Sequence, residues 1–265
     1  LGGMGYYALD VTSPSLGNET TLASRELWEF PNASMTATDR AKVGFSFGKP
    51  IIAKTRAAGW VVIVSSGYNN GTTGASGFSG GDGIGRIFVL NARTGALIRE
   101  ISTGVGTTTT ASGLAQIAAF TERPQVDATI EAVYGGDLLG NLWRFDLSGT
   151  TTASWAVTRI ATITDGSGNI QPITVEPELG VVNRNRYIYF GTGQYLGDSD
   201  VPSNVPENVF ARRRMSFYGI RDNLGVTGAG PVYAAPVRSG MVAQTITKGV
   251  ISKFPTPPEA KRTTP

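Results

Sequence analysis

The apolar residues of this chain fall into short runs in which β-branched and aromatic side chains are frequent, separated by glycine, asparagine and aspartate. One element recurs: a glycine, an aromatic-rich run and then Asp or Asn, at residues 5–10, 85–91, 140–146 and, more weakly, 216–222. Short runs of this composition between turn residues are typical of β-strands. A pattern that returns along the chain indicates a repeat architecture.

Three further elements accompany the aromatic run in a fixed order. An apolar run that ends in glycine precedes it, at 60–67, 130–136 and 187–191, and another strand-like run comes earlier, at 48–53, 114–120 and 171–175. A fourth run follows it, at 27–30, 97–101, 157–163 and 242–247. Four strands in this order make one antiparallel propeller blade of roughly 40–50 residues. The sequence therefore predicts an all-β fold, a partial quinoprotein-like β-propeller with about three whole blades and part of another.

The predicted propeller region covers residues 1–247, with the end of one blade at about 1–30 and whole blades at about 48–102, 113–163 and 171–247. Residues 248–265 are rich in Pro and Thr, and we expect them to be disordered or a truncated continuation. The chain opens without an initiator methionine, so both ends are expected to be cuts in a longer polypeptide.

The long connections are expected on one rim of the propeller. In an up-and-down blade, the connections from second to third strand and from fourth strand to the next blade share a rim. Those connections are long at 67–84, 194–215, 31–47 and 103–113, whereas the opposite rim has short turns at 55–59 and 182–185. Insertions that gather on one face of a repeat protein often mark a binding face. Tolerated surface loops are the alternative interpretation.

Composition narrows the possible functions. The chain has no cysteine and no histidine, which excludes disulfides, Cys- or His-based zinc sites and Ser-His-Asp triads. The net charge of +3 arises within the last residues, so no broad basic face for nucleic acid is expected. No apolar run is long enough for a membrane span, and no direct insertion into a membrane is expected.

The ordered repeats resemble a known family. The segments that carry the resemblance are GYYALDVT at 5–12, FSFGKP at 45–50, GDLLGNLWRFDL at 136–147, YFGTGQYL at 189–196 and FYGI at 217–220. Together they resemble the C-terminal propeller of the PilY/PilC family, which comprises tip-associated adhesins and assembly factors of bacterial type IV pili. The resemblance implies an exported, non-enzymatic binding domain at the pilus tip, outer membrane or cell surface. It would act in adhesion, pilus biogenesis or twitching motility, with pilin or minor pilin subunits, or a host or abiotic surface, as partners.

Two other interpretations of the same repeats remain open. One is a dehydrogenase propeller that uses pyrroloquinoline quinone, which would show the absorbance of a quinone. The other is a scaffold propeller of outer-membrane assembly, which would not copurify with pilin-like proteins. The absence of cysteine counts against the dehydrogenase, because many such enzymes stack a vicinal disulfide on the quinone. We expect no bound cofactor.

The resemblance also implies a position for calcium. Several family members carry a loop of the form D-x-D-x-D-G-x-x-D, which would fall here on residues 123–131. The residues left as ligands are Gln125, Asp127 and Glu131, while Arg123 replaces the first ligand with a cation. Calcium prefers six to eight oxygen ligands, several of them charged. We therefore expect an ordinary turn in which Asp127 or Glu131 pairs with Arg123, and weak calcium binding at most.

Several side chains have predicted structural roles. Trp60, Trp143 and Trp155 are expected to pack between blades, with Trp143 and Phe145 buried on opposite faces of their strand. The glycine-rich segment 80–85 is expected to be a flexible loop with a turn at Asp82. A solvated loop is predicted around Asp198 and Asp200.

Overall fold

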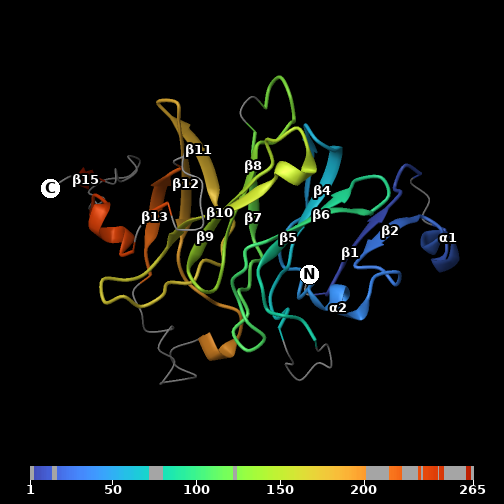
Figure 1. Ribbon diagram of the computed structural model, residues 1–265, viewed down its shortest axis with the longest axis horizontal. Helices are drawn as coiled ribbons and strands as arrows, with labels where there is room; N and C mark the ends of the chain where they lie inside the picture. The colour runs from blue at the N-terminus through green and yellow to red at the C-terminus, as the bar shows by residue number, and fades with distance from the viewer. Residues whose placement is uncertain are drawn as a thin grey trace, which may run out of the picture.

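The computed structural model describes residues 3–13, 17–71, 80–121, 124–200, 215–222, 232–233, 235–243, 245–247 and 261–263. Within these ranges the fold is all-β, as predicted, with antiparallel sheets that stand side by side in Figure 1. Short helices lie in the connections: α1 (Glu19–Ala23), α2 (Ala37–Ala41), η1 (Thr152–Ser154), η2 (Asp198–Asp200) and η3 (Val237–Gly240). No helix in the described part of the chain is long and apolar enough to cross a membrane.

Two complete four-stranded blades confirm the predicted order of strands. The first contains β3 (Ile51–Thr55), β4 (Gly59–Ser65), β5 (Arg86–Asn91) and β6 (Leu97–Ser102), paired in that order. The second contains β7 (Ile117–Phe120), β8 (Ala132–Gly136), β9 (Asn141–Asp146) and β10 (Ala156–Thr162). In both blades the register shifts between the third and fourth strands. Such β-bulges increase the local twist of a sheet.

The N-terminal sheet has two strands, β1 (Tyr6–Leu9) and β2 (Glu26–Phe30), at the positions predicted for the end of a blade. The last blade contains β11 (Glu178–Val182), β12 (Asn185–Gly191) and β13 (Phe217–Arg221). The predicted first strand at 171–175 is wrong, because the strand begins after Pro177. Residues 171–173 bond to two blades: the Ile173 backbone N–H donates to the Asp137 carbonyl of the preceding blade at 2.9 Å, and the Pro172 carbonyl accepts from the Gly193 N–H, just after β12, at 2.7 Å.

The predicted strand at 242–247 also takes a different place. Only β14 (Thr245–Thr247) forms there, and it pairs with β15 (Lys261–Thr263) rather than with β13. The chain between β13 and β14 returns to the preceding blade, where the backbone N–H groups of Val232 and Tyr233 donate to carbonyls of β10. This return explains why, among the described residues, the sheet of β13 has three strands.

Apolar layers between neighbouring sheets form the core. One layer, with Ile63 and Val89, joins the two complete blades, and another, with Tyr134 and Ile188, joins the second complete blade to the last sheet. Trp143 and Phe145 are both buried, as predicted, but their assignment to opposite faces is wrong. Both belong to the first layer, because residues two apart on a strand point to the same face.

Two of the three tryptophans predicted to pack between blades do so. Trp143 and Trp155 are 3 % and 4 % exposed within the layer between the complete blades. Trp60 is 55 % exposed, so its predicted burial is wrong. It occupies the second position of β4, outside the layer in which β1 and β2 cover Val62 and Val64.

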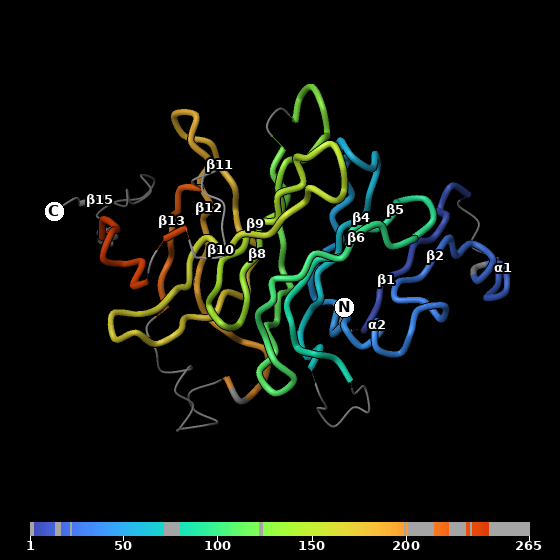
Figure 2. Tube along the Cα trace, viewed as in Figure 1, coloured from blue at the N-terminus to red at the C-terminus, as the bar shows by residue number. Residues whose placement is uncertain are grey.

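The described parts of the long connections gather at one edge of the sheets, as the sequence predicted. Figures 1 and 2 show α2, the connection 103–113 and the segment around η2 along the lower edge, and we call this edge the loop rim. The turns after β3 and β11 lie along the upper edge, together with residues 124–131 of one longer connection. Of the predicted loops 67–84 and 194–215, residues 72–79 and 201–214 lie outside the described residues.

Candidate partner-binding rim

The loop rim is held by a buried arginine at the start of β5. The Arg86 side chain is 3 % exposed, and its Nη1 and Nη2 donate to the two carboxylate oxygens of Asp82 at 2.8 and 2.7 Å. Its Nε lies 2.9 Å from Glu100 Oε1 on β6. The hydrogen bonds from Arg86 lower the pKa of Asp82. The turn predicted at Asp82 is present, since the Ile84 N–H donates to Asp82 Oδ1, but the carboxylate also anchors the loop to the blade.

Backbone contacts between neighbouring rim loops make the same segment rigid. The Gly83 N–H donates to the Asn70 carbonyl at 3.0 Å, and the Gly83 carbonyl accepts from the Ser112 N–H at 2.8 Å. Gly83 has a φ of +74°, and a Cβ there would lie 1.8 Å from the Thr107 carbonyl oxygen. Only glycine permits this approach. The segment 80–85, predicted as a flexible loop, is thus bonded to both neighbouring rim loops.

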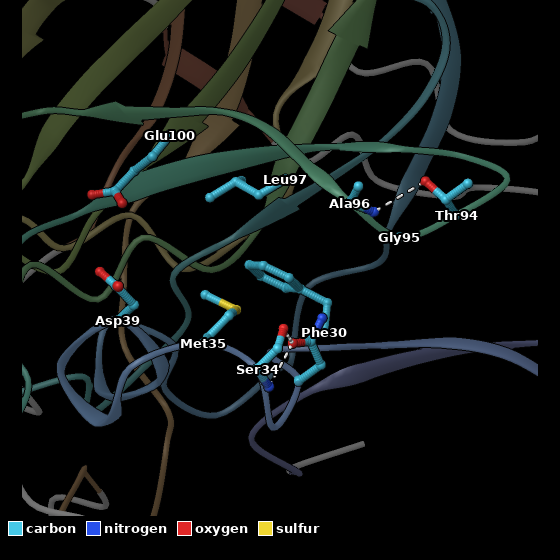
Figure 3. Close-up of a pocket in the computed structure, with 10 residues that line it drawn as sticks. Phe30, Ser34, Met35, Asp39, Thr94, Gly95, Ala96, Leu97 and Glu100 are labelled. Carbon is cyan, nitrogen blue, oxygen red and sulfur yellow. Dashed lines mark hydrogen bonds between the residues drawn. The ribbon is translucent and has the colours of Figure 1, made fainter.

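One pocket lies between the end of β2 and the start of β6, and its volume is about 450 Å³. Figure 3 shows Phe30, Met35 and Leu97 as its apolar part, with Asp39 and Glu100 at one end. Lys42 Nζ lies 2.9 Å from Asp39 and 3.0 Å from Glu100, and its hydrogen bond to Asp39 lowers the pKa of that carboxyl group. Both carboxylates are thus compensated by a cation of the protein itself.

A second hollow lies on the loop rim, and we call it the rim groove. It encloses about 510 Å³ and is lined by Phe45, Phe47, Tyr68, Asn69, Gln116, Leu138, Thr174, Tyr195 and Leu196. Its size falls within the range of about 300–1,000 Å³ that is typical of ligand sites. None of the lining residues is charged. Phe47, Tyr195 and Leu196 are 44 %, 73 % and 48 % exposed, which is unusual for large apolar side chains that lie close together.

The repeat itself assembles the rim groove. Phe47, Gln116 and Thr174 stand in the segments that lead into the first strands of three successive blades. Tyr68, Leu138 and Tyr195 follow the second strands of the same blades. Because equivalent positions of neighbouring blades meet at one rim, residues far apart in sequence line one surface. The predicted elaborated rim therefore contains a formed groove, although no single motif in the sequence indicates it.

The aromatic wall of the groove is fixed by ring contacts and one side-chain bond. The Phe47 ring centroid lies 6.4 Å from that of Phe45 and 5.8 Å from that of Tyr68. Gln116 Nε2 donates to the Phe47 carbonyl at 3.0 Å. Burial raises the pKa of Tyr68 to about 12, so its hydroxyl is neutral at physiological pH.

The opposite wall is held by a buried carboxylate. Asp200 in η2 is 8 % exposed, so the expected solvated loop is wrong for this residue. Its Oδ2 accepts from the Leu196 backbone N–H at 2.7 Å, and its Oδ1 accepts from Gln194 Nε2 at 3.0 Å. Asp200 therefore fixes the backbone of the turn that presents Tyr195 and Leu196.

The two carboxylates proposed as calcium ligands have partners within the protein. Asp127 Oδ1 accepts from the backbone N–H and the hydroxyl of Thr129 at 3.1 and 2.8 Å, which is the geometry of a local turn. Glu131 accepts from Arg186 Nη2 at 2.8 Å and lies 3.7 Å from Arg56. Gln125 is exposed in the same connection, and the predicted cation partner at position 123 lies outside the described residues. Within the described ranges, no group of three or more Asp and Glu residues is arranged to hold a metal ion.

Isothermal titration with calcium is expected to show no binding in the micromolar range. Glu131 is engaged by two arginines, and two carboxylates with one amide fall short of the usual ligand number. The protein should first be treated with a chelator, and Asp127→Ala serves as the matched variant. A micromolar site that this substitution abolishes would contradict the expectation and establish a calcium loop at 123–131.

Sequence reasoning missed a buried ionic cluster between the second complete blade and the last sheet. Asp222 accepts from Arg144 Nη1 and from Tyr134 Oη, while Arg186 Nη1 donates to Tyr134 Oη at 2.9 Å. Arg186 also lies over the Phe120 ring, 3.5 Å from its centroid. Burial, and then the charge of Asp222, raises the pKa of Tyr134. The available signal was the presence of arginine within otherwise apolar strands, at Arg144 and Arg186.

The GDLLGN segment has a structural role. Asp137 is fully buried, and its carboxylate accepts from Ser112 Oγ, Asn141 Nδ2 and Trp143 Nε1 at 3.0, 3.0 and 2.9 Å. Backbone N–H groups of Leu139 and Asn141 add 3.0 and 2.8 Å bonds. Burial raises the pKa of Asp137, and these donors oppose the rise. The segment thus ties the turn after β8 to β9 and to the neighbouring rim loop.

Repeated four-stranded antiparallel sheets, packed face to face with their connections sorted onto two edges, define a β-propeller. A family model described as the PilY1 beta-propeller domain matches residues 1–256. The chain therefore belongs to the PilY1 β-propeller family.

Relatives and a solved structure agree with this assignment. The chain is 32 % identical, over 98 % of its length, to a type IV pilus biogenesis factor PilY1 homolog of Xylella fastidiosa. It is 27 % identical, over 96 % of its length, to type IV pilus biogenesis factor PilY1 of Pseudomonas aeruginosa. It spans 16 % and 21 % of the length of these two proteins. The crystal structure of the P. aeruginosa PilY1 C-terminal domain matches 98 % of the chain with a TM-score of 0.69 and 25 % identity, and the match covers 51 % of that domain.

Proposed function

We propose that this chain is a non-enzymatic binding domain of a type IV pilus biogenesis factor, exported to the cell surface or pilus tip. Its partners would be pilus subunits, with surface adhesion as a further outcome of the same binding. Membership of the PilY1 propeller family supports the connection to pili. The observation that carries the binding role is the rim groove, an exposed apolar surface on rim loops that buried ionic and backbone contacts hold in place.

The rim geometry suits binding because the sheets form the scaffold while the rim loops carry the contact surface. The packed sheets supply a rigid base, and the connections present side chains from several blades on one edge. Anchored loops lose little conformational entropy when a partner binds, and more of the contact energy then appears as affinity.

Shortening the rim loops is expected to reduce piliation and adhesion. Residues 72–79 and, separately, 201–214 should be replaced by short Gly-Ser turns in the full-length protein. These boundaries retain Asn70, Asp82 and Asp200, which brace the rim, so folding is expected to persist. Shortening the connection 124–129 on the opposite edge provides the control. Normal piliation and adhesion in both rim variants and in a variant with Tyr195→Ala and Leu196→Ser in the rim groove, with folding confirmed by circular dichroism, would show that the loop rim does not bind a partner.

A further inference from the structure

We infer that the rim groove binds an uncharged, extended peptide segment that inserts apolar side chains, supplied by a pilus subunit. This inference rests on the proposed function and specifies the chemistry of the partner. It arises from four features of the groove: its uncharged lining, its exposed apolar residues, the brace that presents two of them, and its extension across three blades.

The electrostatics of the groove favour an uncharged segment. None of its lining residues carries a charge, and Lys49 and Glu176, which flank the lining residues Phe47 and Thr174 in sequence, lie 3.8 Å apart as an ion pair. A charged side chain that entered the groove would lose water without gaining an ion-pair partner among the lining residues, which is costly. An apolar side chain would instead cover Phe47, Tyr195 and Leu196 and remove their exposed surface from water.

Hydrogen bonds within the fold hold Tyr195 and Leu196 in their exposed positions. Asp200 is buried and directs both of its carboxylate oxygens to this turn, one to the Leu196 N–H and the other to the Gln194 amide. A buried carboxylate with several donors is a strong positional constraint, because leaving it unpaired is costly. The turn is thus held with two large apolar side chains facing solvent, as expected of a contact surface.

The polar groups of the groove favour a peptide over a glycan. A sugar presents many hydroxyls, and each needs a partner when it is buried. The groove offers two amides and the Thr174 hydroxyl besides its tyrosines, and two of these three groups already donate to backbone carbonyls: Gln116 to Phe47 and Thr174 to Gly193. An extended peptide requires fewer polar partners for each apolar side chain that it inserts. The groove spans three blades, which suits an extended segment.

The test uses overlapping short peptides, acetylated and amidated, that cover the pilin and minor pilin sequences of the host bacterium. Binding to the full-length protein is measured by fluorescence anisotropy at low and high salt. We expect uncharged apolar peptides to bind, with an affinity that salt does not reduce. The double substitution Tyr195→Ala with Leu196→Ser should weaken this binding by about tenfold or more, equivalent to about 1.4 kcal/mol.

The control replaces Val126, which is 79 % exposed in the connection on the opposite edge, with serine, and it should leave peptide binding unchanged. Asp200→Ala should also weaken binding, while Asp198→Ala, which removes the exposed carboxylate of η2, should not. Peptide binding that survives the double substitution, or binding of a glycan array that the substitution abolishes, would overturn the inference. If full-length pilins bind and only the loop-shortened variants lose that binding, the proposed function stands and the groove inference fails. If pilins do not bind at all, both fail.

Discussion

Replacing Asp222 with alanine is expected to destabilise the fold by about 3–5 kcal/mol, because it removes the buried carboxylate that accepts from Arg144 and Tyr134. The Asp222 side chain is fully buried, and the Arg144 side chain that donates to it is 3 % exposed. Tyr134 and Arg186 complete the cluster, and Arg186 is also paired with Glu131 at 2.8 Å. The cluster holds two arginines and two carboxylates. Removal of one carboxylate therefore leaves two arginines with one carboxylate between two sheets.

Urea unfolding followed by fluorescence would measure the loss. Asp222→Asn should fall between the wild type and the alanine variant, because the amide oxygen still accepts hydrogen bonds but the charge is gone. Replacing Asp222 and Arg144 together by leucine and methionine should recover much of the stability, since the buried arginine that remains, Arg186, keeps its partner Glu131. Asp198→Ala serves as the exposed control. An Asp222→Ala protein within about 0.5 kcal/mol of the wild type, the usual range for surface substitutions, would show that the cluster does not stabilise the interface.

The strand order of the two complete blades could be predicted because it depends on local patterns. Apolar runs, closing glycines and Asp or Asn after the aromatic strand lie next to each other in sequence, and β3 to β10 match them closely. The sequence also predicted that long connections share a rim, since strand order alone sorts the loops onto two edges. The partners in the last blade could not be predicted in this way. Residues 171–173 bond to both the preceding and the last blade, and residues 232–233 bond to the preceding blade; these pairings depend on tertiary contacts.

The rim groove was beyond sequence reasoning for a different reason. Phe47, Leu138 and Tyr195 are far apart in the chain, and only the stacking of blades brings them together. The residues predicted as calcium ligands show the reverse case, in which residues close in sequence have different partners. Asp127 and Glu131 are close in sequence, yet one forms a local turn and the other pairs with Arg186 from β12. Proximity in sequence therefore did not establish a shared site. The error over Trp143 and Phe145 was one of strand periodicity, which the residue spacing alone should have settled.

Trp143→Ala is the second substitution with a large expected effect. The Trp143 ring is 3 % exposed in the layer between the complete blades, and truncating a buried tryptophan costs about 3–5 kcal/mol. The indole Nε1 also donates to Asp137 Oδ2 at 2.9 Å, and that carboxylate is fully buried. The substitution thus creates a cavity and removes one donor from a buried anion. Both effects weaken the contact between the turn after β8 and the rest of its blade.

Two further variants separate these effects. Trp143→Phe keeps most of the ring but loses the donor, and we expect a loss of about 1–3 kcal/mol at neutral pH. Removing a donor raises the pKa of Asp137 in the folded state, so the part of the loss that comes from the ionised carboxylate is present above that pKa and disappears below it. Trp60→Ala is the matched control, because its ring is 55 % exposed, and it should change stability by less than about 0.5 kcal/mol. Equal urea midpoints for Trp143→Ala and Trp60→Ala would show that burial of Trp143 does not stabilise the core. A Trp143→Phe loss that does not shrink as the pH falls would assign the effect to packing instead of to Asp137.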